Sequence, residues 1–268
     1  MLLSNAVSRL FGKFAQTEFP YFLQKIINIS YVKLMKLDMS EFDEPSSYKT
    51  LNQLFTRALK NPRIFSYGVL SPVDAFVSKM GKVENDTIFQ IKGMEYSLGE
   101  MLTQNYKEQA TKLEGGDYAN FYLSPKDYHR YHIPCDMQIK SVTHVPGKLY
   151  PVNFKYLQKV PNLFIENERV IVECDVDGKL IFLVLVGALN VGKMVVNFEK
   201  DIETNRKVDE IRKFTYTDLR LKRGDEFGYF KMGSTIVMIS EKDLLELDVY
   251  ESSKVRFGDK IADFKQIQ

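Results

Sequence analysis

The spacing of apolar residues changes from helical at the start of the chain to strand-like in the remainder. Residues 1–15 carry apolar side chains on one helical face at Leu3, Ala6, Val7, Leu10, Phe11 and Phe14. This spacing predicts an amphipathic helix. The stretch FPYFLQKIINISYVKLMKL, with Pro20 near its start and lysines along one flank, predicts a second helix. Residues 40–59 predict a loop and then a further amphipathic helix that Ser46 and Ser47 can cap.

From Val69 onward the chain consists of short runs of β-forming residues separated by turn residues. In ERVIVECDVDGKLIFLVLVGAL, Asp177 and Gly178 separate two such runs and predict an antiparallel hairpin. SLGEMLTQN predicts one more helix, and residues 201–218 form a polar connection. The fold class is therefore α+β. Residues 1–60 are expected to form N-terminal amphipathic helices, and residues 61–268 a β-rich antiparallel sandwich or barrel domain.

One apolar run contains an unexpected glycine. GYFKMGSTIVMIS, residues 228–240, resembles a strand that is interrupted by Gly233 and Ser234. Glycine weakens a strand interior because it loses more freedom on folding and has no side chain to pack. By itself this pattern favours a β-bulge or tight bend. Whether the Gly-Ser bond has another purpose depends on the rest of the chain.

Charge and length refine the picture of the N-terminal region. The 268-residue chain has a net charge of only +2, which argues against a dedicated nucleic-acid binder. Residues 1–36 nevertheless carry a single acid, Glu18, against Arg9, Lys13, Lys25, Lys33 and Lys36. A basic, amphipathic start of this kind predicts contact with an anionic membrane surface, and no apolar run is long enough to span one. The two cysteines have no paired spacing, which predicts neither a disulfide nor a cysteine zinc site and fits a reducing cytosol.

The residues that could perform catalysis lie in two polar segments of the chain. The three histidines, His129, His132 and His144, all lie within LSPKDYHRYHIPCDMQIKSVTH. Their imidazoles could act as general acid or base, could bind a metal with His144 or Asp127 as third ligand, or could be structural. Asp74 interrupts an apolar run in VLSPVDAFVSKMG. It could form an Asx-turn, or it could orient a histidine in a Ser-His-Asp relay.

Several motifs together resemble a known family. In chain order they are VLSPVDAFVSKMGKV, FQIKGMEYSLGEML, FYLSPKDYHRYHIP, HVPGKLYPVN, PNLFIENERV, VGALNVGKM and RGDEFGYFKMGST. From about Phe55 to the C-terminus, the chain resembles the phosphatidylserine decarboxylases of the bacterial, pyruvoyl-dependent type, and the basic helical start is also similar. The chain departs from the usual family pattern at Ala75, commonly Gly, and Met232, commonly Leu, and neither change removes a reactive atom.

The resemblance implies that the chain cuts itself between Gly233 and Ser234. A β chain of residues 1–233 and an α chain of residues 234–268 would result, with Ser234 converted to a pyruvoyl group, the covalent cofactor. The resemblance also implies that Asp74 and His132 activate Ser234, that His129 assists substrate binding and decarboxylation, and that no metal is used. A serine hydroxyl needs such a base, and the absence of a Cβ on Gly233 lets the hydroxyl approach the carbonyl carbon. On this interpretation, glycine is present so that the next residue can break the chain.

The implied activity is decarboxylation of phosphatidylserine to phosphatidylethanolamine through a Schiff base with the pyruvoyl group. The expected setting is the cytoplasmic face of the cell membrane, with peripheral attachment and a homodimer as a further expectation from the resemblance. Two alternatives remain open. One is a zinc-dependent hydrolase that uses His129, His132 and His144, and the other is a non-enzymatic adaptor at the membrane surface. Both alternatives predict an uncut chain.

Overall fold

The structure is a computed structural model. It describes residues 10, 12–91, 94–152, 154–189, 193–205, 210–231 and 234–265. Most of the first predicted helix lies outside the described residues, although residues 12–16 are helical. Gly233 and Met232 also lie outside them.

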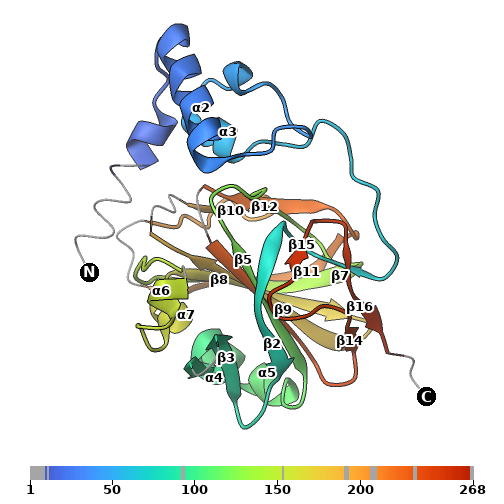
Figure 1. Cartoon of the computed structure of the whole chain (residues 1–268). Coiled ribbons are helices and arrows are strands. Elements are labelled where there is room, and N and C mark those ends of the chain that lie inside the picture. The colour runs from blue at the N-terminus through green and yellow to red at the C-terminus, as the bar shows by residue number, and fades with distance from the viewer. Residues whose placement is uncertain are drawn as a thin grey trace.

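A large antiparallel sheet forms the centre of the molecule (Figure 1). Its strands lie in the order β11-β7-β8-β9-β13-β5-β2-β15. Their bounds are β2 Ala75–Lys82, β5 Asp117–Leu123, β7 Met137–Val145, β8 Arg169–Val176, β9 Lys179–Gly187, β11 Arg212–Leu221, β13 Ser234–Ser240 and β15 Lys254–Val255. Within the described residues the edge strands β11 and β15 do not pair with each other, so the sheet is open. The architecture is therefore a sandwich and not a barrel.

Both faces of the central sheet are covered. Two small sheets pack on one face: β1 Val69–Leu70, β16 Lys260–Phe264 and β14 Leu245–Leu247 form the first, and β10 Met194–Val196, β12 Glu226–Phe230 and β6 Arg130–His132 the second. The other face is covered by β3 Thr87–Ile91, β4 Met94–Ser97, α4 Leu98–Leu102, η2 Gln104–Tyr106, α5 Lys107–Lys112, α6 Phe154–Leu157 and α7 Leu163–Glu166.

The double covering explains the long apolar runs in the sequence. In β13, Ile236 and Met238 enter the core beneath the small sheets, whereas Val237 and Ile239 enter the core beneath the helices. A strand that is buried on both faces must be apolar at successive positions. The predicted hairpin is confirmed: Asp177 and Gly178, with φ angles of 51° and 85°, join β8 to β9. Positive φ at both positions is what a type I′ turn requires.

The N-terminal helices lie at one end of the sandwich, opposite the end that carries α5 (Figure 1). Helix α2, Tyr21–Met35, confirms the second predicted helix, and Pro20 occupies its N-cap. The helix predicted within residues 40–59 is shorter than expected: η1 spans Pro45–Ser47 and α3 only Leu51–Phe55. Its cap is Thr50, whose hydroxyl accepts from the Gln53 amide at 3.0 Å, and not Ser46 or Ser47.

Two sequence interpretations need correction. The run GYFKMGSTIVMIS belongs to two strands, β12 and β13, which lie in different sheets. The polar stretch that was predicted as a connection contains most of β11, a ten-residue edge strand. Phe214 and Tyr216 of β11 pack against the core while their neighbours face solvent. Because only one side of this strand is partly buried, its composition is too polar for the strand to be recognised from its sequence.

Candidate active site

Position 234 lies at the start of a central strand. Ser234 is the first residue of β13 and pairs with Leu123 at the end of β5 and with Gly187 at the end of β9. Hydrogen-bonded neighbours on both sides fix this part of the backbone. The next residue, Thr235, is fully buried, and within the described residues its hydroxyl has no hydrogen-bond partner.

His129 is held in the loop that leaves β5. The carboxylate of Asp127 accepts from the amide and the hydroxyl of Ser124, both at 2.7 Å, and closes this loop. Nδ1–H of His129 donates to the Asp127 carbonyl at 2.8 Å. Its Nε2 is buried without a partner in the described part of the chain. Burial lowers the pKa of His129 to about 3, so the ring is neutral at neutral pH and Nε2 carries a free lone pair.

His132 is the last residue of β6 and is also neutral. Its Nδ1 lies 3.0 Å from the Gly224 carbonyl and must therefore carry the proton, which leaves Nε2 to accept from the Tyr128 hydroxyl at 3.0 Å. The ring stacks on Phe257 with centroids 3.5 Å apart. Burial lowers the pKa of His132 to about 4. The sequence favoured a loop or single turn for both histidines, but only His129 lies in one.

Asp74 is tied to Arg63 and not to His132. Its carboxylate accepts from Arg63 at 2.5 and 2.9 Å and from the backbone amide of Phe257 at 2.8 Å. The ring of that same Phe257 stacks on His132. Asp74 is thus connected to His132 through Phe257, whereas the sequence suggested a direct hydrogen bond between carboxylate and imidazole.

Backbone contacts bring the histidine loop close to the strand end that precedes position 234. The amide of Phe230, the last residue of β12, donates to the carbonyl of His129 at 2.9 Å. His129 therefore lies between the end of β12, four residues before Ser234, and the end of β5, which pairs with Ser234. Strand pairing and this single bond unite residues that are about 100 positions apart in the sequence.

His144 belongs to a different part of the molecule. Its Nε2 lies 2.8 Å from a carboxylate oxygen of Glu168, and both side chains are buried. Glu168 also accepts from the backbone amide of Asn205. Among the residues that the structure describes, no three His, Cys, Asp or Glu side chains are grouped as metal ligands. The structure therefore does not bring His129, His132 and His144 together as the zinc-site alternative requires.

Sequence reasoning missed the contribution of the helical region to this site. The ring of Phe55, from α3, lies against His129 with centroids 4.0 Å apart. Arg57 donates to the Lys126 carbonyl at 2.9 Å, and Arg130 donates to the Thr56 carbonyl at 2.9 Å. These contacts join segments about 70 residues apart, so no local pattern in the sequence could have indicated them.

Asn167, in the motif PNLFIENERV, has a structural role that the sequence did not indicate. Its amide nitrogen donates to the carbonyls of Tyr150 at 2.9 Å and Gly187 at 2.7 Å, and its oxygen accepts from the Tyr150 amide. The side chain is fully buried. Because Gly187 pairs with Ser234, Asn167 fixes the strand next to position 234. A buried asparagine that meets three backbone groups is a positioning residue.

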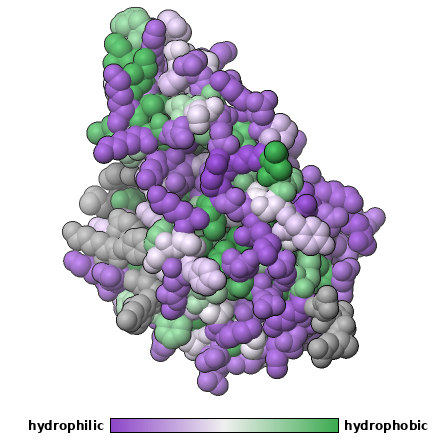
Figure 2. Space-filling model, turned by 45° about the vertical axis from the view of Figure 1, so that its right-hand side comes forward, coloured by the Kyte–Doolittle hydropathy of each residue, from purple (hydrophilic) through white to green (hydrophobic). Residues whose placement is uncertain are grey.

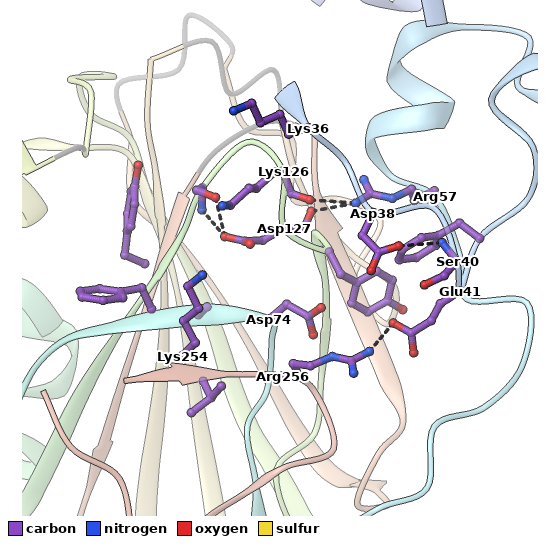
Figure 3. Close-up of a pocket in the computed structure, with 17 residues that line it drawn as sticks. Lys36, Asp38, Ser40, Glu41, Arg57, Asp74, Lys126, Asp127, Lys254 and Arg256 are labelled. Carbon is purple, nitrogen blue, oxygen red and sulfur yellow. Dashed lines mark hydrogen bonds and ion pairs between the residues drawn. The ribbon is translucent and has the colours of Figure 1, made fainter. Parts of the chain in front are cut away.

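A cavity of about 740 Å³ separates the helical region from the end of the sandwich (Figure 3). Tyr128, whose hydroxyl binds His132, forms part of its wall, as do Tyr122 and Ser124 at the end of β5. The other lining residues are Lys36, Asp38, Ser40, Glu41, Phe42, Arg57, Asp74, Ala75, Phe76, Lys126, Asp127, Lys254, Val255 and Arg256. The cavity is therefore bordered by Tyr128, which binds His132, and by β5, the strand that pairs with Ser234.

Known proteins resemble this chain over almost its whole length. A family model described as Phosphatidylserine decarboxylase matches residues 51–263. The phosphatidylserine decarboxylase proenzyme of Campylobacter jejuni is 46% identical over 267 residues, covering 98% of this chain and 100% of the relative. That of Helicobacter pylori strain Shi470 is 45% identical over 267 residues, with 98% of each chain covered. That of Idiomarina loihiensis is 41% identical over 275 residues, covering 98% and 93%. The chain therefore belongs to the phosphatidylserine decarboxylase family, and it is a decarboxylase.

Proposed function

We propose that this chain converts phosphatidylserine to phosphatidylethanolamine with a pyruvoyl group made from Ser234 by autocatalytic cleavage of the Gly233-Ser234 bond. The observation that carries the proposal is the location of position 234, at the start of a strand whose neighbour β5 leads directly into the His129 loop. Cleavage there gives a β chain of residues 1–233 and an α chain of residues 234–268. Residues 61–268 act as the catalytic domain.

The residues around position 234 fit a carbonyl cofactor. Two polar atoms there, Nε2 of His129 and the hydroxyl oxygen of Thr235, are buried and have no partner in the described part of the chain. Unpaired buried polar atoms are costly unless a ligand or cofactor satisfies them. Once formed, the pyruvoyl ketone supplies an electrophile that binds the substrate amine and accepts the electron pair released as CO2 departs.

Self-cleavage requires a base for the Ser234 hydroxyl, and His132 can supply it. Its ring is neutral and its basic nitrogen is Nε2, because Nδ1–H is committed to Gly224. Nε2 accepts from the Tyr128 hydroxyl, so this hydrogen bond must open, or Tyr128 must pass the proton on, when the Ser234 hydroxyl is deprotonated. After losing its proton, the hydroxyl oxygen bonds to the Gly233 carbonyl carbon and the peptide C–N bond breaks, with the nitrogen taking a proton. The resulting ester then loses the Cα proton of residue 234, and its Cβ–O bond breaks to release the Gly233 carboxylate as the C-terminus of the β chain. The dehydroalanine left at position 234 tautomerises to an imine, and hydrolysis of this imine gives the ketone and releases ammonia.

His129 is the candidate acid for the decarboxylation step. Its Nε2 is the unpartnered nitrogen, while Nδ1 is fixed on the Asp127 carbonyl. Because the pKa of His129 is about 3, Nε2 of the resting ring carries a lone pair, and it must first accept a proton before it can deliver one to the substrate carbon that loses CO2.

Helix α2 supports attachment to a membrane surface. Tyr21, Phe22, Ile26 and Leu34 are 69%, 68%, 57% and 79% exposed. Figure 2 shows apolar surface on the part of the molecule that α2 forms. Lysines on the same helix favour an anionic surface. No helix within the described residues has the length and hydropathy to cross a bilayer. The exposed apolar face of α2 supports a role of residues 1–60 as a peripheral anchor, whereas the homodimer and the cytoplasmic location are proposed from the family resemblance alone.

Intact-mass analysis of freshly purified protein tests the proposal. We expect two species that correspond to residues 1–233 and 234–268, and a carbonyl on the small chain that borohydride or hydroxylamine traps. Ser234→Ala should give one full-length species without that carbonyl and without CO2 release. A wild-type protein that stays a single uncut chain would refute the proposal and favour a hydrolase or an adaptor.

A further inference from the structure

We infer that the 740 Å³ cavity binds the phosphodiester of the substrate through Lys36, Lys126 and Lys254. The inference rests on the proposed function and adds the recognition of the lipid headgroup to it. The three lysines come from separate parts of the chain: the C-cap of α2, the loop after β5, and β15. Figure 3 draws their side chains around one cavity.

The carboxylates of the cavity are already engaged. Glu41 pairs with Arg63 and Arg256, and Asp74 pairs with Arg63. Asp127 accepts from the amide and hydroxyl of Ser124. Asp38 accepts from the backbone amide of Ser40 at 2.9 Å. Glu41 and Asp74 are thus paired with arginines, whereas Asp38 and Asp127 have neutral partners and keep their charge. Counting Arg63, six cations of the described residues still face four carboxylates around the cavity.

The three lysines are not held in ion pairs in the described part of the chain, although Lys126 is attracted to the neighbouring Asp127 carboxylate. Within the described residues, Lys36, Lys126 and Lys254 form no ion pair with a carboxylate. Because the cavity wall carries more cations than carboxylates, its potential is positive and attracts an anionic ligand. A phosphate group accepts several charge-assisted hydrogen bonds at once and can bind ammonium groups that reach it from separate elements.

Arg57 strengthens the positive potential from the cavity wall. Its side chain is 2% exposed, and its Nη2 donates to the backbone carbonyl of Lys126. Its Nε and Nη1 have no hydrogen-bond partner among the described residues. A buried charge is normally paired, because burial without a partner is costly. An anion in the cavity would compensate this charge through space.

The strand register relates the lysines to position 234. Lys254, Phe76, Tyr122 and Thr235 are consecutive partners across β15, β2, β5 and β13. Three strand spacings separate the Cα atoms at the ends of this row by about 14 Å. Phe76 and Tyr122 line the cavity between those ends. A headgroup that lies along this row has its phosphate near the lysines and its amine toward β13.

The same orientation suits the acyl chains. Lys36 immediately follows α2, the helix with the exposed apolar side chains. A phosphate held by Lys36 lies at the junction between the cavity and α2, so the attached glycerol and acyl chains extend toward the proposed membrane surface. The polar cavity then holds only the headgroup.

Steady-state kinetics on lysine variants tests the inference. Lys126→Gln and Lys254→Gln should each raise KM for phosphatidylserine in mixed micelles by about tenfold, because each removes one charge-assisted hydrogen bond to the phosphate. We expect kcat to stay within about twofold. Lys112→Gln, on α5 at the opposite end of the molecule, is the matched control and should leave both constants unchanged. Variants that still cleave themselves have folded.

Two further arms identify the anion. Inorganic phosphate should compete with the lipid in the wild type, and this competition should weaken in the Lys126→Gln and Lys254→Gln variants. If phosphate binding weakens in the variants while KM for the lipid does not change, the cavity is a free-phosphate site and the headgroup assignment is wrong. If the cleaved, active variants match the wild type in both respects, the inference is refuted.

A different result would show that the proposed reaction is wrong while the anion site is right. A wild-type protein that cuts itself but releases no CO2 from phosphatidylserine would overturn the proposed reaction. Calorimetric titration of wild type and variants with inorganic phosphate would still decide whether these lysines form an anion site. Equal phosphate affinity in all proteins would then reject the site as well.

Discussion

Helix α2 and strand β9 are both rich in apolar residues, but they place them in opposite environments. Every residue of β9 from Ile181 to Gly187 is buried. In α2 the buried residues are Gln24 and Asn28, whereas Phe22 and Ile26 face outward. Apolar content alone therefore does not identify a core. The outward face of α2 is available to another apolar phase, and we propose that this phase is the membrane that contains the substrate.

Polar contacts explain why α2 buries polar residues and exposes apolar ones. The amide nitrogen of Asn28 donates to the carbonyls of Pro45 and Tyr48, both at 2.9 Å. Such a buried side chain selects one orientation of the helix, because any rotation leaves these polar groups unsatisfied. The helix therefore exposes Phe22 and Ile26 as a consequence of where Asn28 is bound.

The helical region and the sandwich are joined at the loop that contains His129. Phe55 packs on His129, and Arg57 binds the backbone of the loop that contains it. Arg63, which follows the helical region, binds both Glu41 and Asp74. The region that we propose to meet the membrane and the region that we propose to perform the chemistry are thus in direct contact. Three experiments can separate or sharpen their roles.

The largest effect is expected in the sandwich, at Asp74. Asp74→Ala removes the acceptor for the Phe257 amide and so releases the ring that stacks on His132. Self-cleavage should slow by about 10² to 10⁴, the usual contribution of a positioned acid or base. Asp74→Asn keeps an oxygen for that amide and should retain more activity than Asp74→Ala. Cleavage rates can be measured by gel after synthesis in vitro.

The control for this experiment is Glu41→Gln, which alters the other carboxylate on Arg63 without touching Phe257. It should cleave at close to the wild-type rate. If Asp74→Asn is as slow as Asp74→Ala while both melt like the wild type, the charge itself matters. The indirect route through Phe257 would then be wrong.

An intermediate effect is expected for variants of α2 that lose exposed apolar side chains. Phe22→Gln combined with Ile26→Gln should weaken binding to vesicles that contain anionic lipid by about 10² to 10⁴-fold, because each buried apolar side chain contributes about 1.5–3 kcal/mol. Self-cleavage should not change, since neither side chain contacts the sandwich. Phe264→Gln alters a phenylalanine that is 44% exposed on β16, away from α2, and serves as the matched control. Sedimentation with vesicles that is equal in all three proteins would contradict the anchor.

The smallest effect concerns pH. The pKa values of His129 and His132 lie near 3 and 4 in the folded protein, below the 6.5 of a free imidazole. Between those values the unfolded chain binds protons that the folded chain does not. The free energy of unfolding should therefore fall as pH decreases from 6.5, by up to about 1.4 kcal/mol per pH unit for each histidine. Above pH 6.5 this contribution disappears.

Histidine NMR measures this directly, because the chain has only three histidines and single His→Asn variants assign their ring signals. The signals of His129 and His132 should stay constant from pH 8 to pH 5.5. A midpoint near 6.5 for either would mean that its ring is accessible to water, and would remove the argument for a neutral base in the sandwich.

Local patterns in the sequence were sufficient for several elements. The hairpin at Asp177 and Gly178 was predictable because a type I′ turn needs two adjacent residues with positive φ. Helix α4 was predictable from its apolar spacing, and the Ser97 hydroxyl caps it. The cap of α3 and the edge strand β11 were missed, because a five-residue helix and a half-exposed strand have weak patterns.

The candidate site was predictable only as a set of residues. The motifs indicated Asp74, His129, His132 and Ser234, and the structure gives each of them specific partners among the described residues. Phe257, Tyr128, Arg57 and Asn167 were not indicated, because their roles come from contacts with residues distant in the sequence. Asp74 meets Phe257 across 183 positions, and only folding can bring such a pair together.

The sequence by itself determined the α+β class, the central hairpin, and the Gly-Ser bond and histidine motif as candidate residues, because turn chemistry, apolar spacing and family motifs are local properties of the chain. The tertiary structure alone decided the outward direction of the apolar face of α2, the tautomer of His132 and the gathering of three lysines around one cavity. The physical reason is that hydrogen bonding, burial and electrostatic potential depend on which distant residues meet, and a linear pattern does not specify that.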